Sequence, residues 1–147
     1  ELGFERAVLI GSDCPDLPRR IIDKAFESLE TNGVVIGPTF DGGYYLIGFS
    51  RNILSGHFFE NMLWSTDRVF RETMRRFVNN GTAVHVLPYW RDMDTLEDIQ
   101  ALMKDYSQKD FGQSKTIRFL KEHGFTGEKG IVSSLRYSIP RVAGFYP

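Results

Sequence analysis

Two aspartates occupy positions from which carboxylates could do chemistry in an α/β protein. Asp13 follows the apolar run of residues 7–10 and a Gly-Ser break, and Asp94 follows a second apolar run at 84–87. Ligands gather at the carboxyl ends of strands in an open α/β sheet, so we expect the two side chains to converge. Converging carboxylates favour a hard divalent cation, Mg²⁺ or Mn²⁺, completed by water and phosphate oxygens. Such an ion can neutralise a diphosphate leaving group.

Asp13 also has a structural interpretation, because an acidic residue just before a helix commonly caps it. Asp16 is better placed for that role, since Pro18 follows it in the expected first turn of the helix. The sequence therefore predicts Asp16 as the N-cap and leaves Asp13 without a capping task. Both interpretations of Asp13 stay open at this point.

Asp94 has an equally simple structural alternative. Thr95 with Asp98, or Asp94 with Glu97, resembles the capping box that begins a helix. A helix follows, because apolar residues recur at helical spacing over 96–106. A cap would explain Asp94 without any function.

A glycine-bearing turn lies between two β-rich runs. Residues 34–38 and 44–49 read as strands, and residues 39–43 between them predict a hairpin with antiparallel strands. Asp41, Gly42 and Gly43 fit ordinary turn chemistry. The second glycine exceeds what a hairpin needs and would let a ligand approach the backbone closely.

The remaining periodicity predicts helices and strands in alternation. Residues 7–10 form an apolar run typical of a strand covered on both faces. An amphipathic helix is expected before residue 30, a second from Ser65 or Thr66 to about residue 79, and a further one over 113–123. Residues 1–107 thus predict an α/β domain, and 108–147 a basic extension that is partly helical or irregular.

Composition limits the classes of partner. The 147 residues carry a net charge of −1, which gives no bulk electrostatic case for binding nucleic acid or a membrane. The single cysteine excludes an internal disulfide framework and fits a reducing compartment. No membrane-span length and no signal peptide are recognisable, so a cytoplasmic location is the default expectation.

Three motifs occur in order and carry a family resemblance. They are Gly-Ser-Asp-Cys-Pro-Asp-Leu at 11–17, Gly-Pro-Thr-Phe-Asp-Gly-Gly-Tyr-Tyr-Leu-Ile-Gly at 37–48 and Asp-Met-Asp-Thr-Leu-Glu-Asp at 92–98. Together they resemble the DUF2064 family of transferases with a glycosyltransferase-A fold, which is related to the molybdenum-cofactor nucleotidyltransferases. The resemblance implies a three-layer α/β/α, Rossmann-like nucleotide-diphosphosugar transferase fold with a mixed sheet.

The resemblance also implies roles for particular residues. Asp13 matches the acidic position that holds the metal and the nucleotide, and Asp94 matches the second metal-side carboxylate. Both would therefore be metal ligands and catalytic residues, with Asp92 as a neighbouring support. The substrate side, for the acceptor or the sugar, would be lined by Ser12, Asp41, Gly42, Gly43 and Tyr44.

Relatives in the family begin with a strand and a basic, glycine-containing loop that embraces the nucleotide, and this chain shows no such segment. We therefore expect residues 1–107 to be the C-terminal portion of the domain, in a fragment, in a homo-oligomer that supplies the missing half, or in a degenerate copy. The function implied is a metal-dependent transferase that uses a nucleotide sugar or nucleoside triphosphate and a small-molecule acceptor. The alternative is a non-catalytic interaction or regulatory module that retains the scaffold.

Overall fold

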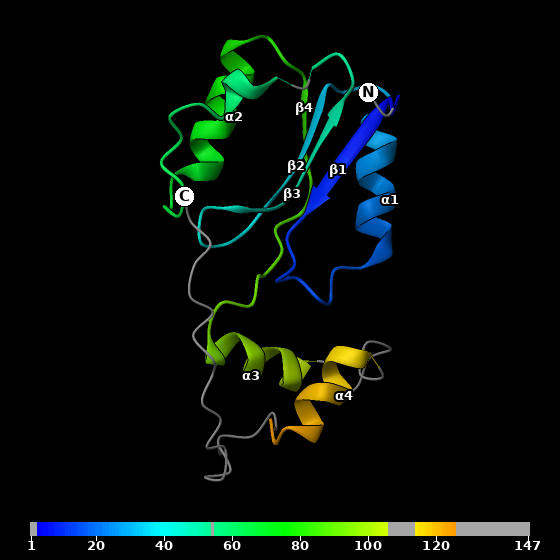
Figure 1. Ribbon diagram of the computed structural model, residues 1–147, viewed down its shortest axis with the longest axis vertical. Helices are drawn as coiled ribbons and strands as arrows, with labels where there is room; N and C mark the ends of the chain where they lie inside the picture. Colours follow the sequence, from blue (N-terminus) through cyan, green and yellow to red (C-terminus); the bar gives the residue numbers. More distant parts are fainter. Residues whose placement is uncertain (1–2, 54, 106–113, 126–147) are drawn as a thin grey trace. The chain divides into compact units, whose positions relative to one another are not determined.

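The computed structural model describes residues 3–53, 55–105 and 114–125 (Figure 1). The chain divides into two compact units, Glu1–Asp98 and Ile99–Pro147. The first unit holds the sheet and is the unit that matters for the candidate site.

A mixed sheet forms the centre of the first unit. It consists of β1 (Arg6–Ile10), β2 (Val34–Pro38), β3 (Tyr44–Ser50) and β4 (Val84–Val86), in the order β1-β3-β2-β4. β3 is antiparallel to both β1 and β2, whereas β4 is parallel to β2. β1, β2 and β4 therefore all run in one direction and end at the same edge of the sheet.

The β2–β3 hairpin contains a β-bulge near its turn. Gly37 pairs with Leu46, but Pro38 pairs with Tyr44, which leaves Tyr45 as the extra residue on β3. A bulge changes which face the following side chains occupy. Tyr45 and Leu46 accordingly both pack on one face of the sheet, while Tyr44 packs on the other.

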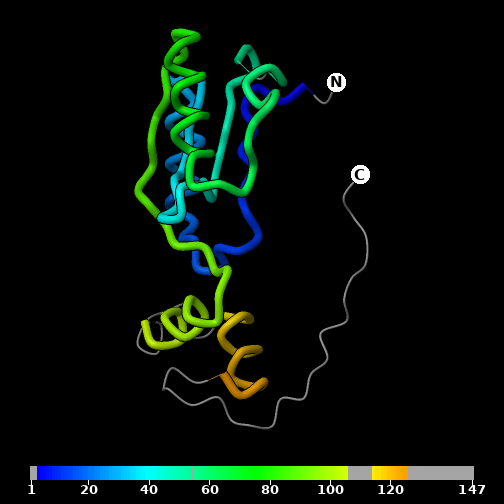
Figure 2. The backbone as a smooth tube through the Cα atoms, turned by 90° about the vertical axis from the view of Figure 1, so that its left-hand side faces the viewer, coloured from blue at the N-terminus to red at the C-terminus, as the bar shows by residue number. Residues whose placement is uncertain are grey.

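Helices cover both faces, as the α/β/α expectation requires. α1 (Arg19–Ser28) buries Ile21 and Ala25 against one face. α2 (Val69–Asn79) buries Phe77 against the other face, where the short 3₁₀ helix η1 (Gly56–Phe58) adds Phe58. Figure 2 shows the same layers from the side, with α2 nearest the viewer. The sheet residues alternate between the two cores: Val35 faces α1, whereas Val34 and Ile36 face α2.

The strand predicted to be covered on both faces is only partly covered. β1 is the terminal strand of the described sheet, with β3 as its one neighbour. Leu9 is 59% exposed and Ile10 43% exposed. The apolar run indicated a strand correctly, but its burial depends on neighbours that a local pattern does not contain.

The helix boundaries differ from the expected ones by a few residues. α2 begins at Val69 rather than near Ser65, and its N-cap Arg68 makes no side-chain capping bond. α3 (Leu96–Asp105) follows the third motif, and α4 (Lys115–Glu122) confirms the helix expected over 113–123. The Ser114 hydroxyl caps α4 by accepting a hydrogen bond from Ile117 N at 3.2 Å.

The predicted division into 1–107 and a basic extension 108–147 stays a prediction, because residues 106–113 and 126–147 lie outside the described residues. Within the described ranges, none of the helices has both the length and the apolar character needed to cross a bilayer.

Candidate active site

The carboxyl ends of three strands meet at one edge of the first unit. The chain after β4 continues alongside β2, since Leu87 N donates to Ile36 O (2.8 Å) and Trp90 N donates to Pro38 O (3.1 Å). It then reaches the end of β1, where Met93 N donates to Asp13 O at 2.9 Å. The predicted convergence of the segments that carry Asp13 and Asp94 is thus present in the structure.

Three carboxylates form a cluster at this edge. One oxygen from each of Asp41, Asp92 and Asp94 can be chosen so that all three lie within 4.8 Å of one another. Asp13 is not part of this trio, but its charge contributes to raising the pKa of Asp92. The structure therefore brings Asp94 together with Asp92 and with Asp41, a residue that the resemblance had placed on the substrate side.

Asp41 is held by the turn that carries it. One carboxylate oxygen, Oδ1, accepts hydrogen bonds from Thr39 Oγ1 (2.5 Å) and from Gly43 N (3.0 Å). These two bonds lower the pKa of Asp41, with the Thr39 hydroxyl as the larger cause. Oδ1 of Asp41 thus stabilises the turn through hydrogen bonds, and the Asp41 carboxylate also belongs to the acidic cluster.

Asp92 is the half-buried member of the cluster. Burial raises its pKa above the ordinary value of 3.8, and the charges of Asp41, Asp94 and Asp13 raise it further. Its own backbone N–H acts in the opposite direction. A carboxyl group surrounded by like charges is one that a cation would stabilise in its ionised form.

Asp94 is not the capping residue of α3. Asp98 Oδ2 accepts hydrogen bonds from Thr95 N (3.0 Å) and Thr95 Oγ1 (2.6 Å), and Asp98 N donates back to Thr95 Oγ1 (3.2 Å). This reciprocal pair is the capping box, so the Asp94–Glu97 alternative is wrong. The structural explanation for Asp94 is thereby removed, and its exposed carboxylate belongs to the acidic cluster.

Asp16 does not cap α1, contrary to the sequence prediction. The N-cap is Pro18, without a side-chain bond, and Asp16 Oδ1 instead accepts a hydrogen bond from Trp90 Nε1 at 3.0 Å. This bond ties the turn after β1 to the segment that leads from β4 to Asp92. It fixes the spacing between two of the three strand ends that form the site.

The turn of residues 11–14 is shaped by Asp13. Its carboxylate folds back over Gly11, where a Cβ would lie 2.5 Å from Asp13 Oδ1, so a larger residue there would require the exposed Asp13 side chain to move. Ser12 and Asp13 are both exposed, and no hydrogen bond involving the Ser12 hydroxyl occurs within the described ranges. Cys14 is buried, and its burial together with neighbouring carboxylates raises the pKa of the thiol to about 12, which makes it a poor nucleophile.

Gly42 joins the glycine turn to the start of α2. Its φ is +94°, and a Cβ there would lie 2.7 Å from Asp67 Cα. Its carbonyl oxygen accepts a hydrogen bond from Phe70 N at 2.8 Å. The second glycine, Gly43, supplies the N–H that Asp41 accepts. At Gly42 the close approach is made by another part of this chain, and the approach of a ligand to Gly43 stays a prediction.

A cavity of about 510 Å³ opens between the glycine turn and the segment before α2. Tyr44 and Trp64 supply aromatic side chains to its wall, and Ser65 and Thr66 supply hydroxyl-bearing residues. Asp41 and Asp94 of the acidic cluster also line it, with Asp67. Ser65 has a positive φ of 58°, an uncommon conformation for a residue other than glycine.

The cavity wall at 64–67 was not predicted from the sequence. An aromatic-rich sequence such as residues 58–64 is also typical of a loop that packs on the core. Trp64 does stack on Phe59, with ring centroids 6.2 Å apart. Its 53% exposed fraction and its place beside Asp94 depend on tertiary contacts. The available signal was the clustering of Trp, Ser and Thr directly before a helix.

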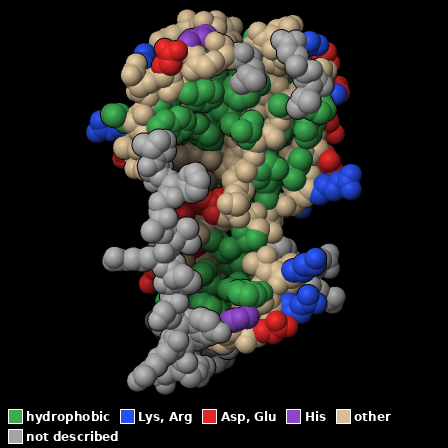
Figure 3. All heavy atoms as spheres, viewed as in Figure 1, with side chains coloured by type: hydrophobic (Ala, Val, Ile, Leu, Met, Phe, Trp, Pro, Cys, Tyr) green, Lys and Arg blue, Asp and Glu red, His purple; other side chains and the backbone are tan. Residues whose placement is uncertain are grey.

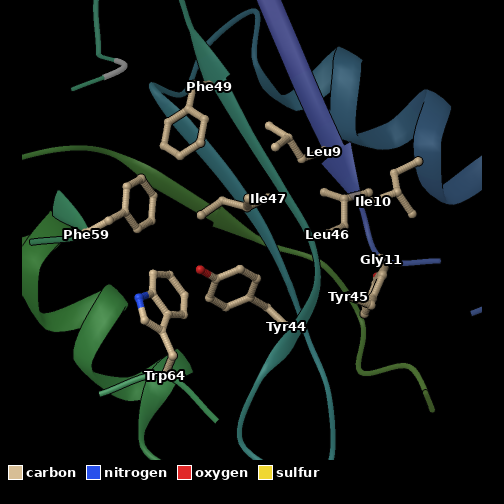
Figure 4. Close-up of a pocket in the computed structure, with 10 residues that line it drawn as sticks. All are labelled: Leu9, Ile10, Gly11, Tyr44, Tyr45, Leu46, Ile47, Phe49, Phe59 and Trp64. Carbon is tan, nitrogen blue, oxygen red and sulfur yellow. The ribbon is translucent and has the colours of Figure 1, made fainter. Parts of the chain in front are cut away.

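An apolar hollow of about 440 Å³ shares Tyr44 and Trp64 with this cavity (Figure 4). Figure 4 shows Trp64 and Phe59 facing the side chains of Tyr44 and Ile47, with Leu9 of β1 across the hollow. The face of the first unit in Figure 3 carries a broad field of hydrophobic side chains. Trp64 thus lines both an apolar hollow and the more polar cavity beside Asp94.

The donor set fits a hard divalent cation. Three carboxylates provide oxygen ligands, and no Lys or Arg in the described ranges forms an ion pair with any of them. Clustered carboxylates without a cationic partner repel one another, and Mg²⁺ or Mn²⁺ binds such oxygen ligands.

The first unit has an α/β fold of the type found in nucleotide-diphospho-sugar transferases. A crystal structure from Desulfovibrio desulfuricans G20, provisionally described as a nucleotide-diphospho-sugar transferase, is 36% identical in sequence with a TM-score of 0.78. The similarity covers 82% of this chain and 52% of that one, so the chain spans about half the length of the solved protein. Residues 1–66 match the model of a family described as an uncharacterized protein conserved in bacteria, DUF2064. The family resemblance stated from the motifs is thereby confirmed. Among curated proteins, no match was found.

Proposed function

We propose that this chain contributes the acidic catalytic edge of a metal-dependent transferase that uses a nucleotide sugar or a nucleoside triphosphate. The observation that carries the proposal is the cluster of Asp41, Asp92 and Asp94 at the carboxyl ends of strands. The similarity to a solved protein described as a nucleotide-diphospho-sugar transferase supports the substrate class.

In this proposal Asp41, Asp92 and Asp94 hold Mg²⁺ or Mn²⁺, and Asp13 lies beside them at the end of β1. When bound, the cation would supply compensation for the negative charge of the phosphates. The chain contributes positioning: the Thr39 hydroxyl orients Asp41, and the Asp16–Trp90 bond holds the segment leading to Asp92. Catalysis by such a site comes mainly from fixed charges and orientation.

The test is a thermal-shift titration of the full chain with Mn²⁺, alone and with a panel of nucleoside diphosphates, triphosphates and nucleotide sugars. We expect stabilisation by one nucleotide class that requires the cation and is lost in Asp94→Asn. Asp13→Asn shows whether the residue outside the trio also contributes to binding. The matched control is Asp23→Asn on the exposed side of α1, where the carboxylate pairs with Arg19 at 3.5 Å.

Cation-dependent stabilisation that survives both Asp94→Asn and Asp92→Asn would refute the assignment of the site. The protein could instead unfold cooperatively at a temperature that neither the cations nor the nucleotides change. That result would favour the alternative, a non-catalytic module that retains the scaffold. The control variant should behave like the wild type in every titration.

A further inference from the structure

The cavity beside the acidic cluster has two kinds of wall. Its lining includes the aromatic residues Tyr44 and Trp64 and the acidic residues Asp41, Asp67 and Asp94. None of the residues that line it is a lysine or an arginine. Arg68 does not line the cavity, but its Nε lies 3.9 Å from Asp67 Oδ1 in a pair whose two side chains are exposed.

We propose that this cavity binds a hydroxyl-rich acceptor that carries no negative charge, such as a sugar or polyol, with Trp64 as its stacking platform. The proposal rests on the proposed function, because it assigns the acceptor of the same transfer reaction. It places the acceptor between the glycine turn and the segment before α2, next to two members of the acidic cluster.

The chemistry of the walls matches such a molecule. Carboxylates accept hydrogen bonds and donate none, so they select ligands with O–H groups. An aromatic ring offers a flat apolar surface to the C–H face of a sugar ring. A cavity of about 510 Å³ is the size of ordinary small-molecule sites.

The charge of the walls argues against a phosphorylated acceptor. Three acidic residues line the cavity; Asp67 is paired with the exposed Arg68 at 3.9 Å, whereas Asp41 and Asp94 form no ion pair within the described ranges, so a phosphate or carboxylate ligand would enter against these two charges. In the absence of a divalent cation, this repulsion should weaken an anionic sugar by about tenfold or more relative to its neutral counterpart. In the proposed reaction, the phosphates of the donor would instead bind beside the cation held by Asp41, Asp92 and Asp94.

Trp64 is built into the wall rather than loosely attached to it. Its ring stacks on Phe59 at an interplanar angle of 23°, and Phe59 packs against the core cluster that contains the fully buried Val34 and Ile36. The side chain nevertheless remains 53% exposed. An aromatic residue that is anchored on one side and open on the other is ready to stack on a ligand without prior rearrangement.

The experiment is saturation-transfer difference NMR on the full chain in EDTA, with three probes: methyl α-glucoside, sorbitol and glucose 6-phosphate. We expect the two neutral probes to bind and the phosphate to bind about tenfold more weakly or not at all. Trp64→Ala should weaken the neutral probes by about tenfold, whereas Trp64→Tyr should restore most of the binding. Leu63→Ala is the matched control, because Leu63 is 73% exposed on the same segment and does not line the cavity.

Preferential binding of glucose 6-phosphate, neutral binding that is unchanged in Trp64→Ala, or no binding of any probe would each overturn the proposal. Tetramethylammonium is added as a fourth probe; if it outcompetes the sugars, the cavity is a cation site and the proposal also fails. Because these measurements contain no divalent cation, they are independent of the Mn²⁺ titrations. Cation-dependent nucleotide binding without sugar binding would overturn the acceptor assignment alone.

Discussion

Replacing Asp92 with asparagine should stabilise the protein in the absence of metal. Asp92 is half-buried and belongs to a trio of carboxylates with oxygens within 4.8 Å of one another. At that separation two unit charges repel by about 0.9 kcal/mol in water, and physiological salt reduces this to about 0.5 kcal/mol. Asparagine removes two such repulsions, so the free energy of unfolding should rise by about 1 kcal/mol.

The effect has a definite pH dependence. The pKa of Asp92 is raised in the folded state above its ordinary value of 3.8. The wild type therefore carries the full destabilisation at pH values above the raised pKa, where Asp92 is ionised in both the folded and unfolded states. As the pH falls from the raised pKa through 3.8, the folded state takes up the proton first, and the advantage of Asp92→Asn disappears.

The assay is chemical unfolding in EDTA at pH 7 and at pH 3.5, compared at low salt and at 1 M salt, with Asp23→Asn as control. The variant's advantage should shrink at 1 M salt, where charges are screened within about 3 Å. With Mn²⁺ added, the order should reverse, because only the wild type retains the complete cluster. An Asp92→Asn variant that is less stable than the wild type at pH 7 and low salt would refute the reasoning.

Three further predictions concern the surroundings of the site. Gly42→Ala should cost about 1–3 kcal/mol in urea unfolding, because its φ of +94° and its contact with Asp67 exclude a Cβ. Tyr45→Phe should cost about 1 kcal/mol, since it removes the 3.0 Å hydrogen bond to Pro88 O, and should leave the fold unchanged by circular dichroism. Cys14 should resist iodoacetamide in the native protein at pH 8 and react on unfolding, because burial raises the pKa of its thiol to about 12; rapid native labelling would contradict this.

The elements that carry the site could be predicted from local sequence. The glycine-bearing link correctly indicated the antiparallel β2–β3 hairpin, because turn chemistry is encoded in adjacent residues. Periodic apolar residues correctly indicated α1 and α2. The convergence of the segments after β1 and β4 followed from a general rule about strand ends.

The details that depend on distant residues could not be predicted. Asp16 looked like a helix cap, but its partner is Trp90, 74 positions away. The inclusion of Asp41 in the cluster depends on the direction of β2 relative to β4, which no local pattern states. The bulge at Tyr45 accompanies close packing of the Tyr45 ring on Gly37, where a Cβ would collide with that ring, and this contact joins residues on two different strands.

The single hydrogen bond from Phe70 N to Gly42 O makes the first turn of α2 and the turn that carries Asp41 one mechanical part. A molecule that seats against Trp64 and displaces the start of α2 also displaces Asp41 relative to Asp92 and Asp94. Occupancy of the cavity and occupancy of the acidic cluster are then thermodynamically linked, and each changes the affinity of the other by the same factor. The same backbone contact therefore couples the two affinities without fixing which ligand binds first.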